Sequence, residues 1–115
     1  MSSYTKSPKK VLELAHRVGS EVFELYSHES SPRTYTQPQL FACLVLKTYM
    51  GLDYRRLHGL LEDYPEIVRT IGMEKIPHFT TFQKASERLM RVPRVKQLLN
   101  ETVSTVGKKK EGTDW

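Results

Sequence analysis

The sequence predicts a single all-α domain, a compact unit of about five to six helices, on three observations. Apolar residues recur every three or four positions along most of the 115 residues, which is the spacing of a helix with one buried side. Capping residues, prolines and glycines lie at the ends of these segments. The length suffices for one hydrophobic core and is too short for two.

The clearest helix is the one that follows Thr36. Thr36 and Gln39 have the spacing of a capping box, and residues 40–46 are apolar on every side. Such a helix is normally buried all round, and we expect it to form the centre of the core and to end at Gly51. A buried strand is the alternative for this apolar run, and the end signals favour the helix.

Three further helices are expected around this central one. The first covers residues 8–26, with Ser7 as its cap. The third follows Asp53 and contains Gly59, whose cost of about 1 kcal/mol relative to alanine inside a helix suggests a close helix approach or a bend. A short fourth helix covers residues 65–71 and is stopped by a glycine.

Two more helices complete the expected domain. Thr80 and Gln83 have the spacing of a second capping box, which starts the fifth helix. The sixth begins at Pro93, and a glycine stops it. The expected division is a helical domain over residues 1–106 and a flexible basic tail over residues 107–115.

The composition favours a polyanionic partner and a reducing compartment. The net charge is +5 and the pI is about 9.4, which bears on partners and not on the fold. The single cysteine, Cys43, excludes an internal disulfide. No signal peptide is visible, and the longest apolar run is far shorter than the roughly 20 residues of a membrane span. We therefore expect a cytoplasmic protein with no membrane partner.

The positive charge is concentrated in residues 80–96. This stretch holds five basic residues and one acidic residue, so it carries +4 of the net charge of +5. On the predicted fifth helix, apolar residues point to one side and cations, hydroxyls and an amide to the other. An amide can read base edges, while cations and hydroxyls hold phosphates. The candidate DNA-facing residues are Thr81, Gln83, Lys84 and Arg88, with Arg91, Arg94 and Lys96 as phosphate contacts.

Different structural interpretations of this basic helix stay open. With the short helix of residues 65–71 before it, it can be the second member of a helix-turn-helix pair, although the joint is longer than the usual three- or four-residue turn. A basic helix face is, however, most often only a solvated surface. Arg55 and Arg56 can add cations to the same surface, or they can pair with the neighbouring acidic residues, Glu62, Asp63 and Glu66.

Four sequence features occur between residues 35 and 90 in an order that matches a known family. They are the helix start Y-T-x-P-x-L, an apolar helix that ends in glycine, the sequence G-L-D-Y-R-R-L, and the sequence I-P-H-F-T-T-F-Q-K. In this order they resemble the helical amino-terminal domain of insertion-sequence transposases of the IS4/IS5 type.

The resemblance implies a DNA-binding domain that recognises the terminal inverted repeats of a transposable element in DNA transposition. In that family a ribonuclease-H-like catalytic domain with three metal-binding carboxylates follows. This chain ends at Trp115, where the first catalytic strand would begin, and two-metal phosphoryl transfer needs several fixed carboxylates. No catalysis and no cofactor are therefore expected of this chain alone.

Other site chemistry has little support in the sequence. The histidines and the cysteine match no zinc-binding spacing, so no metal site is expected. Cys43 lies in the most apolar helix and is expected to fill the core. The acidic residues 62, 63 and 66 lie at a joint between helices, where caps and solvent exposure explain them better than an acid–base pair does.

Two alternatives to a transposase DNA-binding domain remain. One is a helical protein–protein interaction module that self-associates or binds a full-length transposase, and it predicts an exposed apolar patch on the first or sixth helix. The other is a small DNA-binding transcription regulator, which requires two-fold symmetry and a palindromic site.

Overall fold

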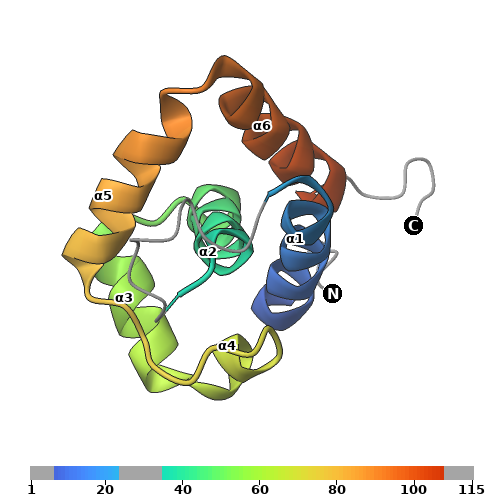
Figure 1. Ribbon diagram of the computed structural model, residues 1–115. Helices are drawn as coiled ribbons and strands as arrows, with labels where there is room; N and C mark the ends of the chain where they lie inside the picture. Colours follow the sequence, from blue (N-terminus) through green and yellow to red (C-terminus); the bar gives the residue numbers. More distant parts are fainter. Residues whose placement is uncertain (1–6, 24–34, 108–115) are drawn as a thin grey trace.

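The computed structural model describes residues 7–23 and 35–107, and these form six helices (Figure 1). The all-α class is confirmed, because no strand occurs in these two stretches. The helices are α1 (Pro8–Val22), α2 (Gln37–Met50), α3 (Tyr54–Asp63), α4 (Glu66–Arg69), α5 (Phe79–Met90) and α6 (Pro93–Gly107). Gly107, expected to be the first residue of the tail, is thus the last residue of α6, and residues 108–115 lie outside the described part.

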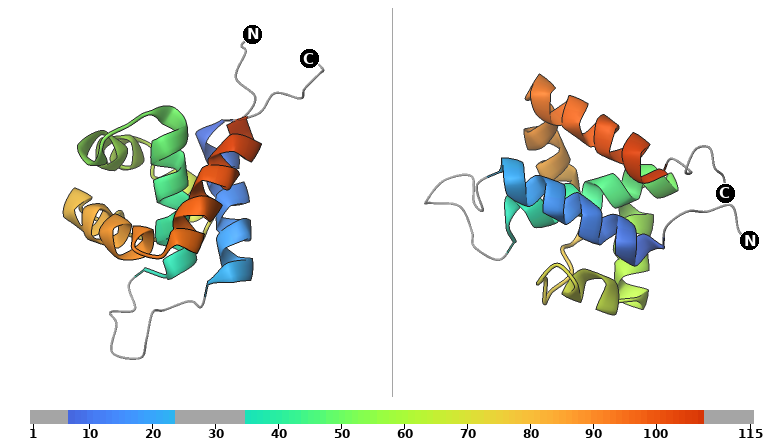
Figure 2. Two further views of the ribbon diagram at one scale, coloured as in Figure 1. Left: turned by 90° about the horizontal axis from the view of Figure 1, so that it is seen from above. Right: turned by 90° about the vertical axis from the view of Figure 1, so that its right-hand side faces the viewer.

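Helix α2 is the centre of the core, as predicted. Every residue from 38 to 46 is buried, and the other five helices surround α2 in Figure 1. Seen from above, α1 and α6 lie on one side of α2, and α3 and α5 lie on the other (Figure 2). A helix that is apolar all round therefore has neighbours on every side, which is the arrangement that removes most apolar surface from water.

Local hydrogen bonds define both ends of α2 and confirm the predicted signals. Thr36 Oγ1 accepts from the backbone N–H of Gln39 at 3.2 Å, and Gln39 Oε1 accepts from the N–H of Thr36 at 2.9 Å. The Gln39 amide also donates to the buried carbonyl of Ile71 at 3.0 Å. Gly51 ends the helix in the left-handed region at φ 70°. Gln39 thereby joins the start of α2 to the chain that follows α4.

Helix α1 is shorter than predicted. The Ser7 cap is confirmed by its hydroxyl, which accepts from the N–H of Lys10 at 3.2 Å. The helix ends at Val22 and not near residue 26, because the backbone of Phe23 is extended. This turn brings the Phe23 ring to 5.3 Å from the ring of Phe41 on α2. The remaining residues of the predicted helix, 24–26, lie outside the described residues.

The close helix approach lies at Gly19 and not at Gly59. A Cβ atom on Gly19 would lie 3.1 Å from Phe41 Cδ2 and 3.2 Å from Pro38 Cα, so α1 and α2 meet at this residue. A Cβ atom on Gly59 would meet nothing within 4 Å. The predicted close approach or bend at Gly59 is therefore wrong. Helix α3 continues through this residue without a break, and a side chain there would point into open space.

Leucine substitutions at the two glycines are expected to change stability in opposite directions. Gly59→Leu should raise the free energy of unfolding by about 0.5–1 kcal/mol, because it removes backbone freedom from the unfolded chain. Gly19→Leu should lower it by about 1–3 kcal/mol through overpacking against α2. Urea denaturation followed by circular dichroism measures both, and two changes of the same sign would contradict this difference.

Cys43 is a core residue, as predicted. It lies on α2 and is fully buried, and burial raises the pKa of its thiol to about 12, since the thiolate is poorly solvated in the apolar core.

The Cys43 thiol is therefore expected to be unreactive in the folded protein. A disulfide reagent at pH 8 should give no thiol signal from the native chain and one equivalent after unfolding in guanidinium chloride, because the chain has one cysteine. Fast modification of the native protein would show that the α2 core opens readily.

Candidate nucleic-acid interface

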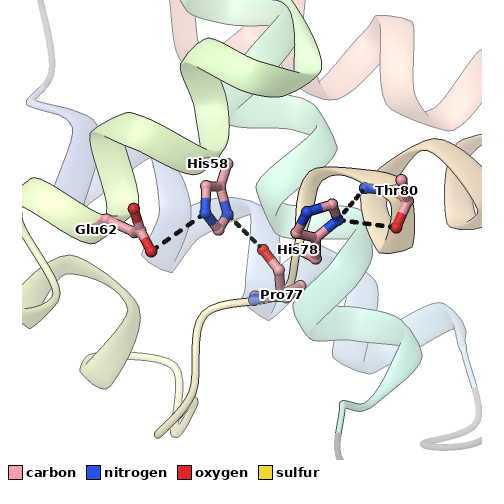
Figure 3. A network of polar contacts seen from close by, with 5 residues as sticks. All are labelled: His58, Glu62, Pro77, His78 and Thr80. Carbon is pink, nitrogen blue, oxygen red and sulfur yellow. Dashed lines mark hydrogen bonds and ion pairs between the residues drawn. The ribbon is translucent and has the colours of Figure 1, made fainter.

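Helix α5 begins two residues earlier than predicted, with a different cap. The N-cap is His78, whose Nδ1 accepts from the backbone N–H of Thr80 at 3.2 Å and faces the Thr80 hydroxyl at 2.9 Å (Figure 3). Thr80 therefore lies inside the first turn, and its predicted capping role is wrong. Pro77 precedes the cap, and the extended backbone of His78 (ψ 155°) places the ring over the first free N–H groups.

Removing the His78 ring is expected to weaken the start of α5. His78→Ala should lower the free energy of unfolding by about 1 kcal/mol, the usual value of a side-chain cap. In a domain of this size that lowers the melting temperature by about 4–8 °C. His78→Asn is the control, because its short side chain keeps an acceptor for the Thr80 N–H. Equal losses in both variants would show that packing of the ring, and not capping, matters.

Helix α5 has one buried side and one exposed polar side, as predicted. Phe82, Ala85 and Leu89 are buried against the core. Gln83, Lys84 and Arg88 are exposed, whereas Thr81 is half-buried. The buried side fixes the orientation of the helix, so the cations of the other side face solvent.

Three cations form a continuous line on α5. Lys84, Arg88 and Arg91 are four and three residues apart, and side chains at these spacings lie on the same helix face. All three are exposed, and Arg91 is the residue that ends α5. The described residues contain no ion pair of these three cations. We call them the basic stripe.

The side chains of Arg94 and Lys96 lie on different sides of α6. Both are exposed in the first turns of α6, but residues two apart point to nearly opposite sides of a helix. Arg94 lines a groove with Val22 and Phe23 at the end of α1. The predicted set of seven residues thus divides between α5 and two sides of α6.

Helix α5 does not pack against the short helix before it. It packs against α3, α2 and α6, whereas α4 packs against α1. α4 is a single turn, Glu66–Arg69, ended by Thr70, whose hydroxyl donates to the carbonyl of Ile67 at 2.7 Å. The predicted helix-turn-helix pair of residues 65–71 with α5 is therefore wrong, since α3 and not α4 lies beside α5.

His58 connects α3 to the segment that enters α5 (Figure 3). Its Nδ1–H donates to the carbonyl of Pro77 at 2.9 Å, and its Nε2 lies 3.2 Å from the carboxylate of Glu62. The rings of His58 and His78 are 5.7 Å apart. Sequence reasoning missed this connection, because the bond joins residues 19 positions apart. The i, i+4 spacing of His58 and Glu62 was the one local signal.

The structure decides for Arg55 whether it joins the surface of α5 or pairs with the acidic residues 62, 63 and 66. Arg55 lies over the ring of Phe79, with its guanidinium carbon 4.8 Å from the ring centroid. In residues 7–23 and 35–107, the Glu62 carboxylate pairs with His58 and neither arginine forms an ion pair. Arg55 thus extends toward the start of α5 and not toward the acidic cluster.

The described residues contain no metal site and no membrane-spanning helix. No group of three or more histidine, cysteine, aspartate or glutamate side chains is arranged to hold a metal ion there. None of the described helices has the length and apolar character needed to cross a membrane. His28, one of the candidate ligands, lies outside the described part.

Comparisons with models of known families, with curated proteins and with solved structures gave no match.

Proposed function

We propose that this chain binds duplex DNA through the exposed face of α5, as the DNA-binding domain of an insertion-sequence transposase that recognises terminal inverted repeats. The observation that carries the proposal is the basic stripe, Lys84, Arg88 and Arg91, which is exposed and has no ion-pair partner among the described residues. The family resemblance between residues 35 and 90 supports the choice of DNA as the polyanion.

The chemistry of α5 supports both components of DNA binding. The cations of the basic stripe can neutralise phosphates, and this electrostatic interaction supplies most of the affinity for DNA. Gln83 stands beside it and is exposed, and a glutamine amide can make two hydrogen bonds to an adenine edge. Thr81 adds a hydroxyl for a phosphate or a base.

A salt series of binding measurements tests the proposal. Fluorescence anisotropy with a labelled duplex should show an affinity that falls linearly with salt on a double-logarithmic plot, with a slope of about −0.9 per phosphate contacted. A duplex of the inverted repeats flanking the coding region should bind more tightly than a scrambled duplex of equal length. Absent or salt-insensitive binding to every duplex would exclude the proposal.

One observation favours a second candidate, a protein–protein interaction module. Val22 and Val92 are 52% and 48% exposed, and both line a groove of about 440 Å³ between the end of α1 and the start of α6. Exposed apolar side chains that gather at one groove are typical of interaction surfaces. This candidate predicts self-association in sedimentation experiments that persists in a Lys84→Ala/Arg88→Ala variant and is lost in Val22→Ser/Val92→Ser.

A further inference from the structure

Arg55 brings a cation of α3 to the first turn of α5. Its guanidinium lies over the ring of Phe79, the first residue of α5, at 4.8 Å. A guanidinium on an aromatic face keeps its N–H groups at the rim of the plane, where they remain available to another acceptor. Phe79 is half-buried, so the ring provides a fixed surface for a side chain that is itself exposed.

The joint between α3 and α5 holds this position. Arg55, His58 and Glu62 are three and four residues apart, so they share one side of α3. On this side the bond from His58 to the Pro77 carbonyl fixes α3 against the chain that enters α5. The Glu62 carboxylate is engaged by His58 at 3.2 Å. Within residues 7–23 and 35–107, Arg55 has no ion pair, so its charge is not cancelled by that acid.

Arg55 adds a cation at the amino-terminal end of α5, on the side of the helix that carries Gln83. Gln83 lies one turn beyond Phe79 on the same side of α5, whereas Lys84, where the basic stripe begins, lies about 140° round the helix from Phe79. Arg55 therefore lies at the end of α5 that holds the candidate base-reading residues, whereas Arg88 and Arg91 lie toward the other end.

We propose that Arg55 is a phosphate contact of the DNA-binding surface, held in place by Phe79, so that the duplex is gripped by α3 and α5 together. This inference rests on the proposed function. It adds a residue from α3 to the candidate contacts on α5 and α6, and it makes Phe79 a positioning residue for that contact.

The test compares Arg55→Ala with Arg56→Ala in the salt series. Arg56 is exposed on the same helix but lies about 100° round it, so it is a control of equal charge. Arg55→Ala should lower the steepness of the salt dependence by about 0.9 and weaken binding about eight-fold at 0.1 M salt, the value for one phosphate contact. Arg55→Lys keeps the charge and should retain the slope.

Phe79→Leu tests the positioning role separately. Losing the ring while keeping apolar bulk should weaken binding by about two- to five-fold, the range for an exposed cation–π contact, with less effect in an Arg55→Ala background. Far-ultraviolet circular dichroism checks that each variant remains folded.

The outcomes separate this inference from the proposed function. If the unmodified chain binds duplexes with a steep salt dependence while Arg55→Ala behaves as Arg56→Ala does, the inference is wrong and the proposed function stands. If the unmodified chain binds no duplex, both are wrong. A reduced slope in Arg55→Ala alone supports both.

Discussion

Replacing Lys84 and Arg88 together with alanine is expected to weaken duplex binding about sixty-fold at 0.1 M salt, if each residue neutralises one phosphate. The two side chains lie on the exposed side of α5, four residues apart, so both can face the same stretch of DNA backbone. The slope of the logarithm of the binding constant against the logarithm of salt should fall by about 1.8. Stability should change little, because substitutions of exposed side chains usually change it by less than about 0.5 kcal/mol.

The matched control is Lys10→Ala/Arg17→Ala on α1. These residues are also exposed, are seven positions apart and so share a helix face, and remove the same charge from the chain. Helix α1 lies on the side of α2 opposite to α5 (Figure 2). Equal losses of affinity in the two double variants would show that net charge, and not the basic stripe, determines binding.

Phe41→Ala is expected to have the largest effect on stability, lowering the free energy of unfolding by about 3–5 kcal/mol. The side chain has no exposed surface and is among the largest fully buried ones. It also contacts two residues at the end of α1, since its ring lies beside Gly19 and 5.3 Å from the ring of Phe23, which follows the helix. A domain of this size has a total stability of about 5–15 kcal/mol, so this change removes a large part of it.

Urea denaturation followed by circular dichroism measures this loss. Tyr64→Ala is the control, because the Tyr64 side chain is large and aromatic but 50% exposed, and its loss should cost far less. If Phe41→Ala were no more destabilising than Tyr64→Ala, the burial of Phe41 between α1 and α2 would contribute little to stability.

Features that depend on neighbouring residues were predictable from the sequence. The capping box of Thr36 and Gln39 and the left-handed Gly51 are local, and both ends of α2 were predicted correctly. The buried side of α5 followed from the spacing of Phe82, Ala85 and Leu89. These features need only helical geometry and the chemistry of the residues themselves.

Features that depend on the packing of distant segments could not be predicted from the sequence. The extended Phe23 that ends α1 places its ring beside Phe41, which is a contact between two helices. The cap of α5 is His78 and not Thr80, because the backbone of His78 is extended. The pairing of α5 with α3 was hidden because the His58–Pro77 bond spans 19 residues. The exposure of the cations was foreseen. The separation of Arg94 from Lys96 was overlooked, although α6 begins at Pro93 as predicted and helical geometry alone places residues two apart on nearly opposite sides.

The division of α5 into a buried and an exposed side has a consequence for how such a domain can diversify. Three apolar side chains, Phe82, Ala85 and Leu89, anchor the helix in the core, while the side chains of Gln83 and Lys84 are exposed and Lys84 has no ion pair within the described chain. Substitutions at those two positions therefore leave folding nearly unchanged. A randomised library confined to the exposed positions of α5 should yield mostly folded proteins, whereas one confined to α2 should yield few.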